Sequence, residues 1–352
     1  MDKNQSTDLI HGSIAKSIFW FSIPLLVGNL FQQLYNTVDA YVVGNYVSKQ
    51  ALAAVGASSP IINMLIGFFM GLATGAGVII AQYFGAGDDK RLKKAVHSSA
   101  ALTIVMSIVL TIVGILGTNP MLHAVGIPAD VFQESSTYLA IYFAGISFNL
   151  IYNMGSGILR AIGDSKQPLY FLIIACIINI ILDFLFVKYL HLGVAGAGYA
   201  TLIAQAISSL MVVLVLMKSD GAHRLNLKNI RFDIPILKKI VMIGLPTGLQ
   251  QSIVSLSNVI VQSYVNAFGS SVVAGYSASI RIDGFVNLPL QSFNMAITTF
   301  VGQNIGAKQY DRVKRGSKIA LWMTMAVIGT MAISLFFFGK EFIAIFNSEI
   351  DV

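Results

Sequence analysis

The sequence predicts an all-helical protein that crosses a membrane many times, and three observations carry this prediction. Hydrophobic residues make up 55% of the 352 residues, charged residues only 11%, and the mean hydropathy is +0.74. Long apolar runs recur along the whole chain, and basic residues gather between alternate runs. Because a soluble domain has roughly a quarter charged residues, an ordinary water-soluble fold is excluded.

Each apolar run is long enough for a membrane-spanning helix of about 20 residues. The charged or Gly/Pro-containing breaks separate nine predicted spans, near 16–42, 52–83, 97–118, 134–159, 168–189, 194–217, 236–264, 272–302 and 317–338. The polar head 1–16 runs straight into the first span, which is therefore expected to act as an uncleaved insertion signal. The single cysteine, Cys176, lies within an apolar run, so no disulfide framework is expected.

The Lys and Arg residues predict the orientation of these spans. Most of the 23 basic residues fall in alternate connections, such as 90–94, 218–239 and 308–318. Since cationic loops resist translocation, we expect a multi-pass protein of the cell inner membrane with a cytoplasmic N-terminus. The net charge of +7 is then a topology signal in contact with anionic lipid, and no nucleic-acid partner is expected.

One loop motif occurs twice and indicates an internal duplication. Gln82-x-x-Gly85-Ala86 returns as Gln303-x-x-Gly306-Ala307, 221 residues later, and in both copies a basic run follows. Pro24 and Pro246, and the pairs Asp130-Val131 and Asp351-Val352, match at nearly the same offset. A six-span repeat returns to its starting side, so the copies are expected to be parallel, with substrate held between two lobes.

The repeat predicts three segments of the chain. Residues 1–217 form an N-lobe of six helices, 218–239 a cytoplasmic linker, and 240–352 a partial C-lobe of about three helices. The second copy ends where the first still has three spans to come, so we expect a truncated second lobe. On the second span, Gly67, Gly71 and Gly75 recur every four residues and predict a seam of close helix packing.

Two carboxylates, Asp39 and Asp183, fall inside predicted spans, where ionisable groups are costly and usually functional. Asp39 shares one helical face with Asn29, Gln32 and Asn36, and Asn179 lies one turn before Asp183. The fourth and sixth spans add the polar side chains Tyr138, Tyr142, Asn149, Asn153, Thr201 and Gln205. We therefore expect oxygen-bearing side chains from four helices to converge in the N-lobe.

Such a cluster has three possible roles. It could bind Na⁺ through carboxylate, amide and hydroxyl oxygens. It could carry a proton, because two neighbouring buried carboxylates cannot easily both ionise. It could also be a hydrogen-bond network that only holds helices together. Pro24 lies fifteen residues before Asp39 and is expected to kink the first span, either as a gate or as a fixed bend.

The sequence contains no pattern that indicates catalysis. The five histidines show no metal-ligand spacing, and neither a nucleophile elbow nor a phosphate loop is visible. We therefore expect no enzyme activity, no cofactor and no ATP-driven transport, so the energy must come from an ion gradient of Na⁺ or H⁺.

These features together resemble the multidrug and toxic compound extrusion (MATE) family. The duplicated Gln-x-x-Gly-Ala loops, the Tyr35-Asn-Thr-Val-Asp39 segment and Gly193-Val-Ala-Gly-Ala-Gly198 before Thr201 carry the resemblance, which covers residues 16–352. It implies a monomeric two-lobe antiporter that exports cationic or amphipathic small molecules in exchange for Na⁺ or H⁺ by alternating access.

Within the family, the chain is similar to the DNA-damage-inducible-protein-F-like branch, and this implies roles for named residues. The coupling cluster would be Asp39, Tyr138, Asn153, Asn179, Asp183 and Thr201, with Na⁺ at Asp39, Asn179, Asp183 and Thr201 and Pro24 as the bending proline. The substrate cavity would include Gln32, Asn36, Gln251, Asn258 and Gln291. The seventh span has amides and hydroxyls from Gln250 to Asn258 but no carboxylate, which argues against a cation site in the C-lobe.

Two alternatives stay open. A lipid-linked oligosaccharide flippase of the same superfamily would need a basic central cavity for pyrophosphate, and Arg281 alone is a poor match. A non-transporting scaffold or an inactive fragment is the other class. A membrane-embedded enzyme fits least, because no pairing of nucleophile and base is apparent.

Overall fold

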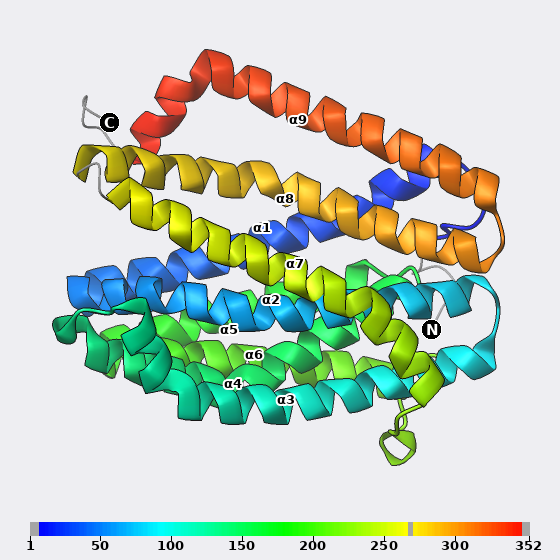
Figure 1. The fold of residues 1–352 in the computed structure, drawn as a ribbon, viewed down its shortest axis with the longest axis horizontal. Helices are drawn as coiled ribbons and strands as arrows, with labels where there is room; N and C mark the ends of the chain where they lie inside the picture. The colour runs from blue at the N-terminus through cyan, green and yellow to red at the C-terminus, as the bar shows by residue number, and fades with distance from the viewer. Residues whose placement is uncertain (1–6, 267–269, 347–352) are drawn as a thin grey trace.

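The computed structural model describes residues 7–266 and 270–346, and the regular elements within them are all helical (Figure 1). The α-helices are α1 (Ile14–Tyr46), α2 (Lys49–Gly85), α3 (Asp89–Val125), α4 (Ala129–Ala161), α5 (Lys166–Asp183), α6 (Gly193–Lys218), α7 (Ile234–Asn266), α8 (Ser270–Gly306) and α9 (Tyr310–Phe346). A π-helical turn, Phe184–Tyr189, continues α5, and a short 3₁₀ turn, Leu227–Asn229, precedes α7. Eight predicted spans each lie within one α-helix, and the span 168–189 covers α5 and the π-helical turn.

Two helices are less apolar than the predicted spans imply. By length and composition, seven helices of the described chain could cross a membrane, and α4 and α8 are not among them. Helix α4 carries polar side chains such as Tyr138, Asn149 and Asn153 and packs against α2, α3 and α6. Because neighbouring helices rather than lipid surround such side chains, a polar helix is tolerated at this place.

The basic connections gather at one end of the molecule, which we call the basic end. Four contacts join them there: Thr7 N–H to the Gly163 carbonyl (2.9 Å), the Gln303 amide to the Ala161 carbonyl (2.8 Å), Lys94 to Asp233 (2.8 Å) and Arg312 to the Gly12 carbonyl (2.8 Å). Figure 1 shows the N-terminal segment, the α2–α3 loop and the α8–α9 loop at the same side of the ribbon. The alternation of charge predicted this grouping.

The two copies of the duplicated motif have the same backbone structure. Asp88 N–H donates to the Tyr83 carbonyl (3.1 Å), as Gln309 N–H donates to the Asn304 carbonyl (2.8 Å). The copies also pack against each other, since a Cβ on Gly85 would overlap the backbone of Gln303 and one on Gly306 that of Gln82. Glycine is therefore required at both positions. The proposed match at Asp351-Val352 lies outside the described residues.

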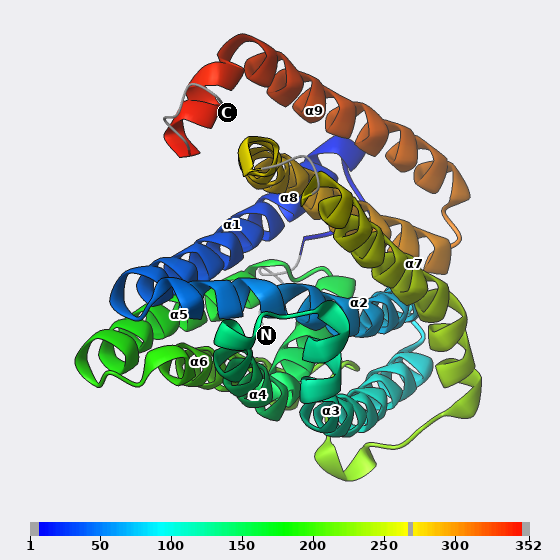
Figure 2. The ribbon, with the colours of Figure 1, turned by 60° about the vertical axis from the view of Figure 1, so that its left-hand side comes forward.

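The predicted glycine seam of α2 lies against α7. A Cβ on Gly71 would overlap the backbone of Gly248, and one on Gly75 would lie 2.5 Å from the Ile240 carbonyl oxygen. Gly67 is less crowded, with the nearest atom, Cβ of Gln251, at 3.5 Å. The predicted close packing is therefore confirmed at two of the three glycines, Gly71 and Gly75. It brings the first and second copies of the repeat into backbone contact (Figure 2).

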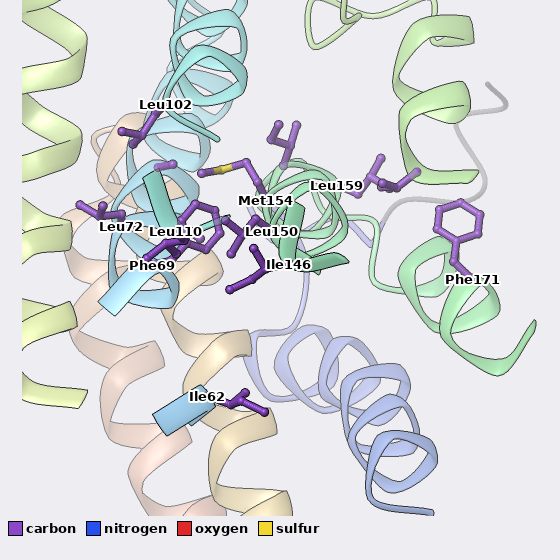
Figure 3. Close-up of a cluster of buried hydrophobic side chains, with 14 of the residues drawn as sticks. Ile62, Phe69, Leu72, Leu102, Leu110, Ile146, Leu150, Met154, Leu159 and Phe171 are labelled. Atoms are coloured by element: carbon purple, nitrogen blue, oxygen red, sulfur yellow. The ribbon is translucent and has the colours of Figure 1, made fainter. Parts of the chain in front are cut away.

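Two clusters of buried apolar side chains fill the spaces between helices. The larger joins α2, α3, α4 and α6, and Figure 3 shows Phe69, Leu110 and Leu150 packed within it. The smaller joins α1 to α8 through Phe21, Phe293 and Phe300, and α9 adds Ala320 to it. Helix α1 therefore packs on the second copy of the repeat near the basic end, although it belongs to the first copy.

Helix α7 begins earlier than predicted, inside the segment 218–239 that we expected to be a linker. Asp233 is the reason, because its carboxylate accepts from Ile236 N–H (3.3 Å) and thus caps the new helix. The rest of the connection is fixed to α3, where Ser98 Oγ accepts from Asp233 N–H (2.9 Å) and His97 Nε2 from Asn226 N–H (3.2 Å). The lobe boundaries themselves stay a prediction.

Candidate ion-coupling site

Asp39 and Asp183 meet in the interior of the first copy. Asp39 lies on α1 and is 6% exposed, while Asp183 is the last residue of α5 and is fully buried. Their carboxyl groups contact each other. Since an ionised carboxylate only accepts hydrogen bonds, this contact becomes a hydrogen bond only when one of the two carries a proton. The π-helical turn starts directly after Asp183, a distortion that is frequent at functional sites.

Tyrosines surround the carboxylate pair. Tyr35 lies one turn before Asp39 on α1, and its hydroxyl lies beside Thr201 of α6. Tyr138 of α4 interacts with both carboxylates, and its ring lies 6.3 Å from that of Tyr142. Helices α1, α4, α5 and α6 thus contribute to one cluster, as the polar faces predicted. Tyr35 was missing from the predicted coupling residues, although its spacing of four from Asp39 could have indicated it.

Several buried polar atoms of this cluster have no hydrogen-bond partner in the described chain. They are the Tyr35 hydroxyl, Asp39 Oδ1, both amide atoms of Asn179, both carboxylate oxygens of Asp183 and Thr201 Oγ1. Buried polar atoms without a partner are rare in proteins, and each calls for an explanation such as a bound water or ion. Most of these atoms are oxygens, the ligands that a hard cation such as Na⁺ needs, so the residues fit a small cation or a proton.

A transition-metal centre has no comparable support. Groups of three or more His, Cys, Asp or Glu side chains that could hold a metal do not occur in the described part of the chain. The cluster offers two carboxylates, and its other oxygens come from amide and hydroxyl groups.

Asn153 is not joined to the rest of the predicted coupling residues. Its amide nitrogen donates to Asn149 Oδ1 and to the Asn149 carbonyl, both at 2.9 Å, so it is bonded within its own helix. Fifteen residues of α4 separate it from Tyr138, which at 1.5 Å per residue is about 22 Å. Both residues lie on α4, and this length of helix places them at different depths.

Pro24 lies inside α1, as expected, and the helix continues through it from Ile14 to Tyr46. Between Pro24 and Asp39, the Asn29 amide donates to Ser292 Oγ of α8 (3.0 Å). The segment that the proline is predicted to bend is therefore connected directly to the second copy of the repeat.

The residues predicted to line a substrate cavity are all exposed. They lie on α1, α7 and α8 and are Gln32, Asn36, Gln251, Asn258 and Gln291. No hydrogen bond joins them to one another in the described chain, and their role in a cavity stays a prediction. The Arg281 side chain, considered for a flippase, lies outside the described part.

A family model described as MatE matches residues 24–185 and 246–352. The chain belongs to the MATE family of membrane transporters. The two matched stretches begin at Pro24 and Pro246, the prolines related by the repeat. A MATE protein is a transporter and not an enzyme, which confirms the sequence prediction.

Several MATE proteins are similar to this chain over nearly its whole length. The probable multidrug resistance protein YpnP of Bacillus subtilis is 31% identical over 350 residues, which cover 98% of this chain and 77% of the relative. The probable multidrug resistance protein YoeA of the same organism is 30% identical over 344 residues, or 96% of this chain and 74% of the relative. A solved multidrug resistance MATE transporter in an outward-facing conformation superposes with a TM-score of 0.91 and 25% identity, over 99% of this chain and 78% of its own.

Proposed function

We propose that this protein exports cationic or amphipathic small molecules in exchange for Na⁺ or H⁺. The observation that carries the proposal is the buried Asp39–Asp183 pair with its unpartnered oxygens. Without a counter-charge, burying both carboxylates in ionised form is costly, so the pair takes up a cation or a proton in one state of the transport cycle. The names of the relatives YpnP and YoeA support a drug as the transported compound.

The coupling follows from the two loading states of the pair. An ion bound at Asp39, Asp183, Asn179 and Thr201 satisfies the buried oxygens and stabilises the packing of α1 against α5 and α6. When the ion leaves, the ionised pair favours a different arrangement of α1, which bends at Pro24. A ligand shifts such an equilibrium only by its differential affinity for the two states.

The basic end faces the cytoplasm in this proposal, with the protein in the cell inner membrane. The charge asymmetry of the connections supports this orientation. The exposed amides at Gln32, Asn36, Gln251, Asn258 and Gln291 then bind substrate between the two copies of the repeat. These side chains are neutral, so they suit an organic cation better than the pyrophosphate of a lipid-linked sugar.

The test is ethidium efflux from cells that lack their own exporters, comparing the full-length protein with its Asp39→Asn variant. We expect the variant to retain ethidium at the level of cells without the transporter, at equal membrane abundance. Asp130→Asn, an exposed carboxylate in the first turn of α4, serves as the matched control and keeps the activity. Equal export by the Asp39 variant would refute the coupling role of this site.

Reconstituted vesicles separate the two candidate ions. An inward Na⁺ gradient at equal pH, or a pH gradient without Na⁺, is imposed and ethidium movement is followed. We expect one gradient to drive transport by the parent protein and neither to drive it in the Asp39 variant. Transport without either gradient would contradict antiport.

A further inference from the structure

The two loops of the duplicated motif have one backbone but different charges. Residue Lys308 occupies the position of Gly87, and both have left-handed backbone angles, with φ of 59° and 64°. A residue with a side chain is strained in this region, which favours glycine. The second loop therefore holds a lysine at a position where the same backbone prefers glycine.

The first loop has carboxylate partners for two of its cations. Arg91 lies 3.5 Å from the Asp88 carboxylate, which also accepts from Arg91 N–H, and Lys94 is bonded to Asp233 at 2.8 Å. Two of its exposed basic side chains thus have carboxylate partners from the protein itself.

The second loop lacks these carboxylates. Gln309 stands at the position of Asp88, and Arg315 stands at that of Lys94. Lys308 and Arg315 are exposed and have no ion-pair partner in the described residues. Arg312 donates to the backbone carbonyls of Gly12 (2.8 Å) and His11 (3.0 Å), and its Nε is buried without a partner.

A cavity of about 440 Å³ lies between these cations. Its lining includes Lys308, Arg312 and Arg315, with Ile14 of α1, Tyr310 and one carboxylate, Asp311. Positive charge therefore exceeds negative charge around a space large enough for a phosphate group and its substituents.

The position of the cavity indicates where a ligand comes from. Helix α9 begins at Tyr310 and continues as an apolar candidate span to residue 337, so the cavity lies where that span meets water. Tyr310 is 60% exposed at this level, where tyrosines are enriched at membrane surfaces.

We propose that this cavity binds the phosphate of an anionic phospholipid headgroup from the leaflet at the basic end. Lys308 and Arg315 neutralise the phosphate, and the Arg312 guanidinium adds a third positive charge to the lining. The lining has three cations and one carboxylate, Asp311, so its excess positive charge favours an anionic glycerol headgroup over the zwitterionic choline headgroup. The lipid phosphate thereby supplies the second loop with the negative charge that Asp88 and Asp233 supply at the first loop. This inference does not depend on drug export.

The experiment measures lipid binding to the purified, delipidated full-length protein. Short-chain phosphatidylglycerol, short-chain phosphatidylcholine and inorganic phosphate are titrated separately, and native mass spectrometry counts the bound molecules. Lys308→Gly and Arg315→Gln remove one cation each, and Lys93→Gln in the first loop removes one as a matched control. Each charge near an anionic headgroup is expected to change the affinity about fivefold.

We expect phosphatidylglycerol to bind more tightly than phosphatidylcholine, and each second-loop variant to weaken it about fivefold. Lys308→Gly relieves a strained backbone, so its melting temperature without lipid should be equal to or above that of the parent. This keeps a loss of binding distinct from a loss of folding. The Lys93 variant should bind as the parent does.

Three results would overturn the proposal. In the first, the Lys308→Gly and Arg315→Gln double variant keeps the parent's affinity for phosphatidylglycerol. In the second, phosphatidylcholine binds as tightly as phosphatidylglycerol. In the third, inorganic phosphate displaces phosphatidylglycerol at equal concentration, which would make a soluble phosphate the ligand.

Discussion

Helices α1 and α7 are the first helices of the two repeats, and an offset of 222 residues aligns them. The aligned pairs are Pro24 with Pro246, Asn29 with Gln251, Asn36 with Asn258 and Asp39 with Val261. Asp39 is 6% exposed against α5 and α6, whereas Val261 is 47% exposed. The duplication kept the proline and the amides but left a carboxylate only in the helix whose neighbours supply a second one.

The α2–α3 and α8–α9 loops differ in the same way. Their backbone hydrogen bonds coincide, yet two cations of the first loop have carboxylate partners, while Lys308 and Arg315 of the second have none in the described chain. In both comparisons the two copies share backbone geometry and differ in their charges, and on this difference we base the proposed ion site in one copy and the proposed lipid site in the other.

The largest expected effect tests whether only the first copy of the repeat holds a functional carboxylate pair. Asp183→Asn should reduce ethidium efflux to the background of cells without the transporter, because a single carboxylate no longer forms the pair. Val261→Asn changes the position that the repeat relates to Asp39 and should leave efflux near that of the parent. If both variants lose efflux equally, the proposed functional difference between α1 and α7 is refuted.

The next effect concerns the contact between the two motif copies. Gly306→Ala places a Cβ into the backbone of Gln82 and should destabilise the fold by about 3 kcal/mol, measured by thermal unfolding in detergent. Gly329→Ala on α9 meets no atom within 4 Å and should stabilise the helix by about 0.5 kcal/mol. A Gly306 variant as stable as the parent would contradict the close approach of the loops.

The third prediction compares two arginines related by the repeat. Arg312→Ala removes hydrogen bonds to the carbonyls of residues 9–12 and should cost about 2 kcal/mol in unfolding free energy. Arg91→Ala removes one surface pair from a side chain that is 65% exposed and should cost under about 1 kcal/mol. Equal losses would mean that the N-terminal segment is not held by Arg312.

The smallest effect is a pH dependence at the first loop. The hydrogen bond from Lys94 holds the pKa of the Asp233 carboxyl below its usual value. A depressed pKa contributes stability that is complete above the unfolded pKa of about 3.9 and is lost as the pH falls through the folded pKa. The melting temperature of the parent should therefore fall more steeply below about pH 4 than that of Lys94→Gln.

Lys93→Gln is the control for this measurement, since it removes one charge from the same loop and leaves the pair intact. It should keep the slope of the parent. A Lys94 variant with the parent's slope would show that the Asp233 pKa has another cause.

The sequence by itself determined the helices, the alternating basic connections, the repeat and the two membrane carboxylates. Apolar length and charge are properties of a continuous segment, so they can be read without knowing its neighbours. The same holds for the glycine seam, because the spacing of Gly71 and Gly75 places both on one face of α2.

Only the tertiary structure decided which faces meet. It brought Tyr35 to Thr201, left Asn153 bonded to Asn149, and paired Lys94 with Asp233 across more than a hundred residues. It also showed that Lys308 and Arg315 border one cavity, which lies where α9 begins. Periodicity fixes the direction of a side chain from its own helix axis, but the packing of helices far apart in the chain fixes what that side chain contacts.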